Sequence, residues 1–273
     1  MSDVPPPHTV RIGVFDSGLG GLSVLRAIHE QIPSAEMLYV ADSGHAPYGE
    51  RSTQFVEDRS QRIANFLHGQ GAQVLVVACN TATAAAVEAL RRDHPAWRIV
   101  GVEPGIKPAA ALTLNGRVGV MATGSTLRSE RFQLLAQAHA ANVELFLQPC
   151  PGLAAAIECG VLDAPEVADL IARYCAALNT HEVDTVVLGC THYPFVANRI
   201  AAAFGPAVRL VDTAQAVARR TAALSGEIAV NPSQDKVSAE ARLWTSGDPQ
   251  LLAEFARRWL PFQCHVECLP SST

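Results

Sequence analysis

The sequence contains very little lysine and no excess of positive charge. Of its 21 basic residues only Lys107 and Lys236 are lysines, and the formal net charge is −5. A chain of this kind lacks the basic surface that binds nucleic acid or an anionic membrane. No apolar run reaches the roughly 18 residues that a membrane-spanning helix needs. The first ten residues, MSDVPPPHTV, have neither the basic nor the apolar segment of a signal peptide, so we expect a cytoplasmic protein.

The cysteines also lack a regular spacing. There are seven, an odd number, in a chain of 273 residues that is 49% hydrophobic and 17% charged. This composition is sufficient for a large buried core, and the length suits two domains of ordinary size. In a cytoplasmic protein we expect the cysteines to be free thiols, one or two of which are catalytic.

Two stretches of the chain match each other, VLVVACNTAT at 74–83 and TVVLGCTHYP at 185–194. Each is an apolar run, typical of a buried parallel strand, that ends at a cysteine followed by small polar residues. Sheets of α/β proteins bind ligands at this end of their strands. Two equivalent thiols, Cys79 and Cys190, therefore indicate chemistry carried out from two sides of one molecule.

Strands and helices are predicted to alternate along the chain, which indicates parallel sheets with helices on both faces. The predicted strands are 11–15, 37–41, the run before Cys79, 99–102, 117–121, 143–148, the run before Cys190, 208–211, 241–245 and 263–268. The predicted helices are 22–31, 55–69, 82–92, 127–141, 153–159, 164–178, 195–203, 214–224 and 250–259. Asp248 is predicted to cap the last helix, with Pro249 at its first position.

The strand pattern repeats once. RIGVFDSG and RVGVMATG lie 106 residues apart, and the two cysteines lie 111 residues apart. A shared offset indicates an internal duplication into two α/β halves. The turn at 16–21 offers backbone N–H groups to an anion, but it has neither the GK[ST] of a P-loop nor the spacing of a dinucleotide site.

The motifs together resemble the cofactor-independent glutamate racemases of the aspartate/glutamate racemase superfamily. They are FDSGLGGLSV (15–24), ADSGHAPYGERS (41–52), ACNTATA (78–84), GVEPGIKPA (101–109), GCTHYP (189–194) and TSGDP (245–249). The resemblance implies two pseudo-symmetric α/β domains, each a mainly parallel sheet flanked by helices, with the active site in the cleft between them. The first domain would comprise 1–103, with 213–273 packing back on it, and the second 104–212.

The resemblance also implies an activity. It is the interconversion of L- and D-glutamate without cofactor or metal, which supplies D-glutamate for peptidoglycan. Racemisation needs an acid and a base on opposite faces of Cα, and two thiols meet that need. By resemblance, Cys79 would take the proton from D-glutamate and Cys190 from L-glutamate. Both precede predicted helices, whose positive ends favour the thiolate.

Further site residues follow from the resemblance alone. Asp16 would lie near Cys79, while His192 and Glu158 would lie near Cys190, as groups that tune or orient the thiols. The substrate would contact hydroxyls, amides and backbone N–H groups, which bind carboxylates without Lys or Arg. The residues so implied are Asp16, Ser17, Pro47, Tyr48, Gly49, Asn80, Thr81, Thr123, Thr126, Thr191 and His192.

Taken singly, the same residues have structural explanations. A cysteine at a strand end is usually a small core residue. His192 fits a hydrogen-bonded histidine at a strand end, and Asp16 fits a helix cap. The repetition of the cysteine motif is what favours the catalytic interpretation.

Other functions remain open from the sequence. An aspartate or hydantoin racemase, or a related decarboxylase, would share the superfamily, although a decarboxylase would be expected to keep one thiol. A pyridoxal-phosphate racemase needs a Schiff-base lysine, for which Lys107 is the only candidate inside a motif. Cys79, Cys190 and His192 could form a zinc site, although the C-x-H spacing is unusual. A two-lobed amino-acid-binding protein is the non-enzymatic alternative. The assembly, monomer or homodimer, is also open.

Overall fold

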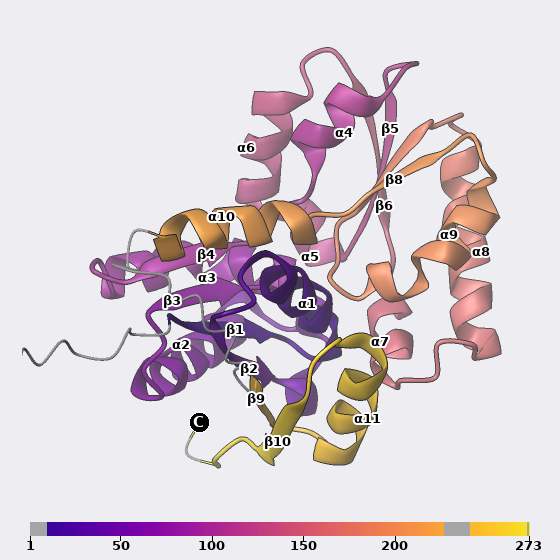
Figure 1. The fold of residues 1–273 in the computed structure, drawn as a ribbon. Helices are drawn as coiled ribbons and strands as arrows, with labels where there is room; N and C mark the ends of the chain where they lie inside the picture. The colour runs from indigo at the N-terminus through magenta and orange to yellow at the C-terminus, as the bar shows by residue number, and fades with distance from the viewer. Residues whose placement is uncertain (1–9, 227–240, 272) are drawn as a thin grey trace, which may run out of the picture.

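The computed structural model describes residues 10–226, 241–271 and 273, which form two lobes, each built on a parallel sheet (Figure 1). The strands of the first sheet are β1 (Arg11–Asp16), β2 (Glu36–Ala41), β3 (Val74–Val77), β4 (Arg98–Gly101), β9 (Ala241–Thr245) and β10 (Cys264–Cys268). Those of the second are β5 (Arg117–Ala122), β6 (Glu144–Pro149), β7 (Thr185–Leu188) and β8 (Arg209–Val211). The predicted α/β class with two mainly parallel sheets is confirmed.

Helices cover the sheets. The α-helices are α1 (Leu22–Gln31), α2 (Thr53–Gly69), α3 (Asn80–Asp93), α4 (Ile106–Leu112), α5 (Gly124–Arg128), α6 (Glu130–His139), α7 (Leu153–Glu158), α8 (Pro165–Asn179), α9 (Ala197–Phe204), α10 (Ala214–Gly226) and α11 (Pro249–Trp259). Short 3-10 turns are η1 (Leu19–Gly21), η2 (Ser43–His45), η3 (Tyr48–Glu50) and η4 (Tyr193–Val196). In the described residues, no helix combines the length and apolarity needed to cross a membrane.

The two sheets share one topology. The strand order is β10-β9-β2-β1-β3-β4 in the first and β6-β5-β7-β8 in the second, so four strands correspond one to one. The pairing of Ile12 with Val74 in the first sheet is matched by that of Val118 with Thr185 in the second. The duplication predicted from the repeated motifs therefore exists in the fold. It places Cys79 and Cys190 at equivalent points, each just beyond the carboxyl end of a central strand.

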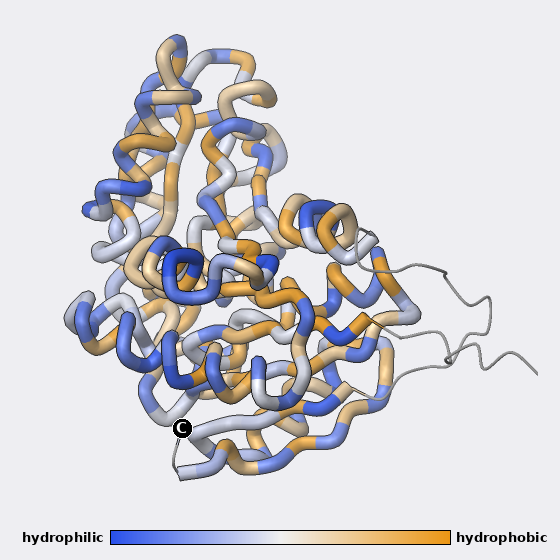
Figure 2. Tube along the Cα trace, turned by 90° about the vertical axis from the view of Figure 1, so that its left-hand side faces the viewer, coloured by the Kyte–Doolittle hydropathy of each residue, from blue (hydrophilic) through white to orange (hydrophobic). Residues whose placement is uncertain are grey.

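Both faces of the central strands are buried, which explains their continuous apolar runs. In β3, Val74 and Val76 belong to the same core cluster as α1, whereas Leu75 and Val77 belong to the cluster of α2 and α3. In the Cα trace coloured by hydropathy, hydrophobic segments gather in the interior and hydrophilic residues on the outer helices (Figure 2). The sheet thereby holds the loops at its carboxyl edge on a rigid support.

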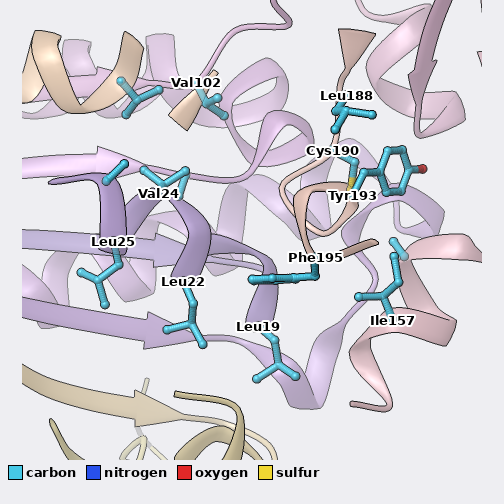
Figure 3. Close-up of a cluster of buried hydrophobic side chains, with 14 of the residues drawn as sticks. Leu19, Leu22, Val24, Leu25, Val102, Ile157, Leu188, Cys190, Tyr193 and Phe195 are labelled. Atoms are coloured by element: carbon cyan, nitrogen blue, oxygen red, sulfur yellow. The ribbon is translucent and has the colours of Figure 1, made fainter. Parts of the chain in front are cut away.

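A single apolar cluster continues from one lobe into the other. Leu19 and Leu22 of the first lobe belong to it, as do Ile157, Tyr193 and Phe195 of the second. Figure 3 shows these side chains around one interior region, with the sulfur of Cys190 beside the Tyr193 ring. Because interiors are close-packed, this contact fixes how the strand ends of the two lobes face each other.

The tail of the described chain lies on the first lobe. β9 and β10 extend the first sheet beyond β2, and α10 packs against α1. The predicted domain limits at 103/104 and 212/213 fall between β4 and α4 and between β8 and α10. These limits remain predictions.

Some predicted elements differ from the observed ones. The helix predicted at 127–141 is two helices, because Ser129 breaks the first and caps α6 by accepting the Phe132 N–H at 3.1 Å. Helix α4 was not predicted, since its seven residues include Pro108 and follow Gly105. The helix predicted at 195–203 is η4 followed by α9. The Asp248 cap is confirmed: its carboxylate accepts the Gln250 N–H at 2.8 Å.

Candidate active site

Cys79 occupies the N-cap of α3, two residues after β3 ends. Its Sγ accepts the backbone N–H of Ala82 at 3.4 Å and lies 3.7 Å from Ser17 Oγ. A helix N-cap needs a side-chain acceptor for its free N–H groups, and here the thiol fills that role. For this reason α3 starts at Asn80, two residues before the predicted start.

Cys190 lies at the equivalent place beyond β7 and leads into a chain of polar contacts. Its Sγ is 3.7 Å from Nδ1 of His192, and Nε2 of His192 is 2.6 Å from Oε2 of Glu158. Cys190 and His192 are buried, and Glu158 is the last residue of α7. A cysteine, a histidine and a carboxylate in this order form the usual arrangement of an activated thiol.

Glu158 also joins the two lobes. It accepts the backbone N–H of Leu19 at 2.8 Å and the hydroxyl of Ser43 at 2.6 Å. Leu19 follows β1 and Ser43 follows β2, so a carboxylate of the second lobe is held by two turns of the first. The sequence analysis did not single out these two residues. Leu19 lies in the FDSGLGGLSV motif and Ser43 in the ADSGHAPYGERS motif, each in the turn after a predicted strand. Their place in these turns could have indicated a role in the site.

Asp16 ends β1 and is fully buried. Its carboxylate accepts the Gly18 N–H at 3.0 Å and the Thr191 hydroxyl at 3.0 Å. Burial raises the pKa of Asp16; His192 acts against this and Glu158 adds to it. Asp16 is not the N-cap of η1 or α1, which are Gly18 and Gly21. It instead connects the first lobe to the residue beside Cys190.

The two thiols have different electrostatic surroundings. Burial, and after it the Asp16 carboxylate, raises the pKa of Cys79 to about 12. The Ala82 N–H acts in the opposite direction, as expected from a helix start, but burial outweighs it. The start of α3 therefore favours the thiolate of Cys79 as expected, but burial dominates and the pKa of Cys79 stays above its ordinary value.

His192 shows the opposite balance. Burial lowers its pKa, but hydrogen bonds to Cys190 and Glu158 more than compensate and raise it well above the ordinary value. The imidazole is thus charged beside Cys190. A charged imidazole next to a sulfur is the setting that stabilises a thiolate.

Three threonines form a cluster of hydroxyls between the lobes. Thr81 Oγ1 lies 3.1 Å from Thr123 Oγ1 and 3.3 Å from Thr126 Oγ1. Asn80, next to Thr81, is buried, and its Oδ1 has no hydrogen-bond partner among the described residues. An unpaired buried acceptor is costly unless a ligand satisfies it.

The loop after β2 reaches the same region. Tyr48 is buried and donates its hydroxyl to Asp42 at 2.5 Å, and Asp42 also holds Arg59 in an ion pair. A Cβ atom on Gly49 would lie 2.8 Å from the Thr123 side chain, so loop and threonine are in close contact. Pro47 is the N-cap residue of η3, at the start of this turn. Asp42 anchors the loop and was not singled out from the sequence.

A small, nearly closed space lies beside Cys190. A cavity lined by Asn80, Cys190 and Thr191 among others measures about 10 Å³. That is about the smallest volume that admits one water molecule. Cys190 also contributes to raising the pKa of Cys79, so the two sulfurs lie within electrostatic range of each other. This space as it stands is too small for an amino acid.

Two alternatives lose support here. Within residues 10–226, 241–271 and 273, no group of three or more His, Cys, Asp or Glu side chains is arranged to hold a metal ion. This excludes a zinc site made of Cys79, Cys190 and His192 in the observed arrangement. Lys107 lies on α4 and lines a different cavity, together with Glu103 and Arg220. The lysine required by the pyridoxal-phosphate alternative is therefore not beside the thiols.

Gly18 provides a test of the contact between the lobes. A Cβ atom at this position would overlap the Glu158 carboxylate. We expect Gly18→Ala to displace Glu158 and to lower the turnover of substrate about 100-fold, since small displacements of catalytic groups have effects of that size. The matched control is Gly69→Ala at the end of α2, where an added Cβ meets nothing within 4 Å. Equal activity of the two variants would contradict the structure of this contact.

Comparisons with known proteins agree with this architecture. The Asp/Glu/Hydantoin racemase family profile matches residues 12–221. A glutamate racemase of Pseudomonas aeruginosa is 48% identical over 243 residues, 89% of this chain and 91% of the relative. The glutamate racemase isoform RacE1 of Bacillus anthracis superposes with a TM-score of 0.86 at 30% identity, covering 98% of this chain and 99% of that one.

A third similar structure contains ligands. It is the Escherichia coli glutamate racemase in complex with L-glutamate and the activator UDP-MurNAc-ala, with a TM-score of 0.85, 31% identity, and coverage of 96% of this chain and 98% of that one. The chain belongs to the Asp/Glu/Hydantoin racemase family and, within it, to the glutamate racemases.

Proposed function

We propose that the protein interconverts L- and D-glutamate by a two-base mechanism in which Cys79 and Cys190 act on opposite faces of Cα, without a cofactor. The observation that supports this most directly is the equivalence of the two thiols. Each lies just past a central strand of its own lobe, and the two sulfurs lie within electrostatic range of each other.

The surroundings of the two thiols fit the two roles. Cys190, whose sulfur lies 3.7 Å from the raised-pKa imidazole of His192, would remove the Cα proton of L-glutamate. The neutral thiol of Cys79 would then supply a proton to the other face. In the reverse direction the roles exchange: Cys79 removes the Cα proton of D-glutamate, and Cys190 supplies a proton to the other face. Asp16 acts on Cys79 through its charge, and Glu158 acts on Cys190 through its hydrogen bond to His192.

The remaining site residues bind the charged groups of the substrate. The backbone N–H groups at the start of α3 and the hydroxyls of Ser17, Thr81 and Thr123 are donors for the two carboxylates. The unpaired Oδ1 of Asn80 is an acceptor for the ammonium group. Donors already in place also stabilise the negative charge that builds up on the α-carboxylate as the proton leaves.

The first test is circular dichroism of D- or L-glutamate incubated with purified enzyme. We expect the signal of either enantiomer to decay to zero with no pyridoxal phosphate added and with a chelator present. The same assay with aspartate is the control for substrate identity. Decay with aspartate alone would keep the mechanism but refute the substrate, and no decay with either would refute the proposal.

The cellular role in the proposal is the supply of D-glutamate for peptidoglycan from the cytoplasm. The resemblance to glutamate racemases and the bacterial relatives support it. Light scattering of the eluted protein from a sizing column distinguishes a monomer from a homodimer.

A further inference from the structure

A second cavity, of about 400 Å³, lies between α2 and α3 of the first lobe and α5 and α6 of the second. Its rim is formed by the exposed residues Arg51, Arg128 and Glu130, among others. Its inner wall includes the buried Thr81. The cavity thus extends from the surface to the hydroxyl cluster of the site.

The first turn of α3 separates this cavity from the closed space beside Cys190. Asn80 lines the closed space together with Cys190, and the next residue, Thr81, lines the larger cavity. The larger cavity is therefore placed as the entrance to the reaction centre.

The charges on the rim favour an anion. Arg128 has no hydrogen-bond or ion-pair partner in the described part of the chain. Arg51 is held in place by its hydrogen bond to the His45 carbonyl at 3.3 Å and by the Phe55 ring below it. Against these two cations stands one carboxylate, that of Glu130.

A local positive charge at this entrance would attract an anionic substrate that the rest of the chain does not attract. The chain as a whole carries a net charge of −5, which repels glutamate, and the residues assigned to substrate contact include no Lys or Arg. We propose that Arg51 and Arg128 form an electropositive entrance that attracts the dicarboxylate to Thr81 and increases its affinity for the site, without taking part in proton transfer. This inference rests on the proposed function.

The test separates KM from kcat. In low-salt buffer we expect Arg128→Ala to raise KM for both enantiomers about two- to fivefold, and the double variant with Arg51→Ala about tenfold, with kcat within about twofold of wild type. At about 0.5 M KCl the differences should vanish, because salt screens charges that do not touch the substrate. Arg128→Lys keeps the charge and should keep the wild-type KM.

The matched control is Arg92→Ala, which removes an exposed arginine from the far end of α3 and should leave KM unchanged. An unchanged KM in Arg128→Ala at low salt would overturn the inference, as would a rise in KM that persists at high salt or that Arg128→Lys shares. All of these measurements use an active wild type. A wild type that does not racemise glutamate would refute the proposed function instead.

Discussion

Replacing either Cys79 or Cys190 with serine is expected to abolish racemisation, lowering kcat/KM for glutamate by about three orders of magnitude or more. A serine hydroxyl keeps the shape of the thiol but is a far weaker acid, so the proton transfer on that face stops. Because the two enantiomers have equal free energy, kcat/KM must fall by the same factor in both directions in each variant. Circular dichroism of both enantiomers measures this.

Exchange of the Cα hydrogen with D2O shows which thiol acts on which enantiomer of glutamate. Cys190→Ser retains Cys79 and should exchange the Cα hydrogen of D-glutamate without inverting it, while Cys79→Ser should do so only for L-glutamate. Proton NMR of the Cα–H signal follows the exchange. The control is Cys175→Ser, which alters a buried thiol of α8 outside the site and should racemise normally. Racemisation by either active-site variant at the wild-type rate would contradict the two-thiol mechanism.

Glu158→Gln is expected to lower kcat/KM about 10- to 100-fold and to change its pH dependence. The glutamine retains the size of the side chain but removes the negative charge beside Nε2 of His192. A hydrogen bond to Glu158 is one of the two contacts that raise the pKa of His192, so its loss lowers that pKa. The charged imidazole is then lost at a lower pH.

The measurement is the pH profile of kcat/KM, whose limbs report the free enzyme. We expect the alkaline limb of Glu158→Gln to shift toward lower pH, because the pKa of His192 falls when the carboxylate is removed. Glu166→Gln, an exposed glutamate at the start of α8, is the control and should retain the wild-type profile. An unshifted alkaline limb would show that Glu158 does not act through His192.

The fold was predictable because its signals are local. Four-residue apolar runs such as Val74–Val77 are buried on both faces and bounded by polar residues, so the strands could be recognised. The repeat of RIGVF as RVGVM predicted the duplication for the same reason. The errors lie where one side chain decides an element boundary, as with the Ser129 cap between α5 and α6 and the Cys79 cap of α3.

The contacts around Glu158 could not be predicted in the same way. The carboxylate contacts Leu19, Ser43 and His192, which lie 139, 115 and 34 residues away in the chain. Nothing in the local sequence around Glu158 encodes these partners. They meet because β1, β2 and β7 end at facing edges of two sheets.

The sequence by itself determined the two α/β halves and the two strand-end thiols, because hydrophobic periodicity and motif repetition are properties of short segments. Only the tertiary structure decided how the thiols differ. Burial and Asp16 keep Cys79 protonated against the effect of its helix, and contacts with Cys190 and Glu158 keep His192 charged. The physical reason is that desolvation and charge–charge interactions depend on distances between segments remote in sequence, which are set when the two lobes pack together.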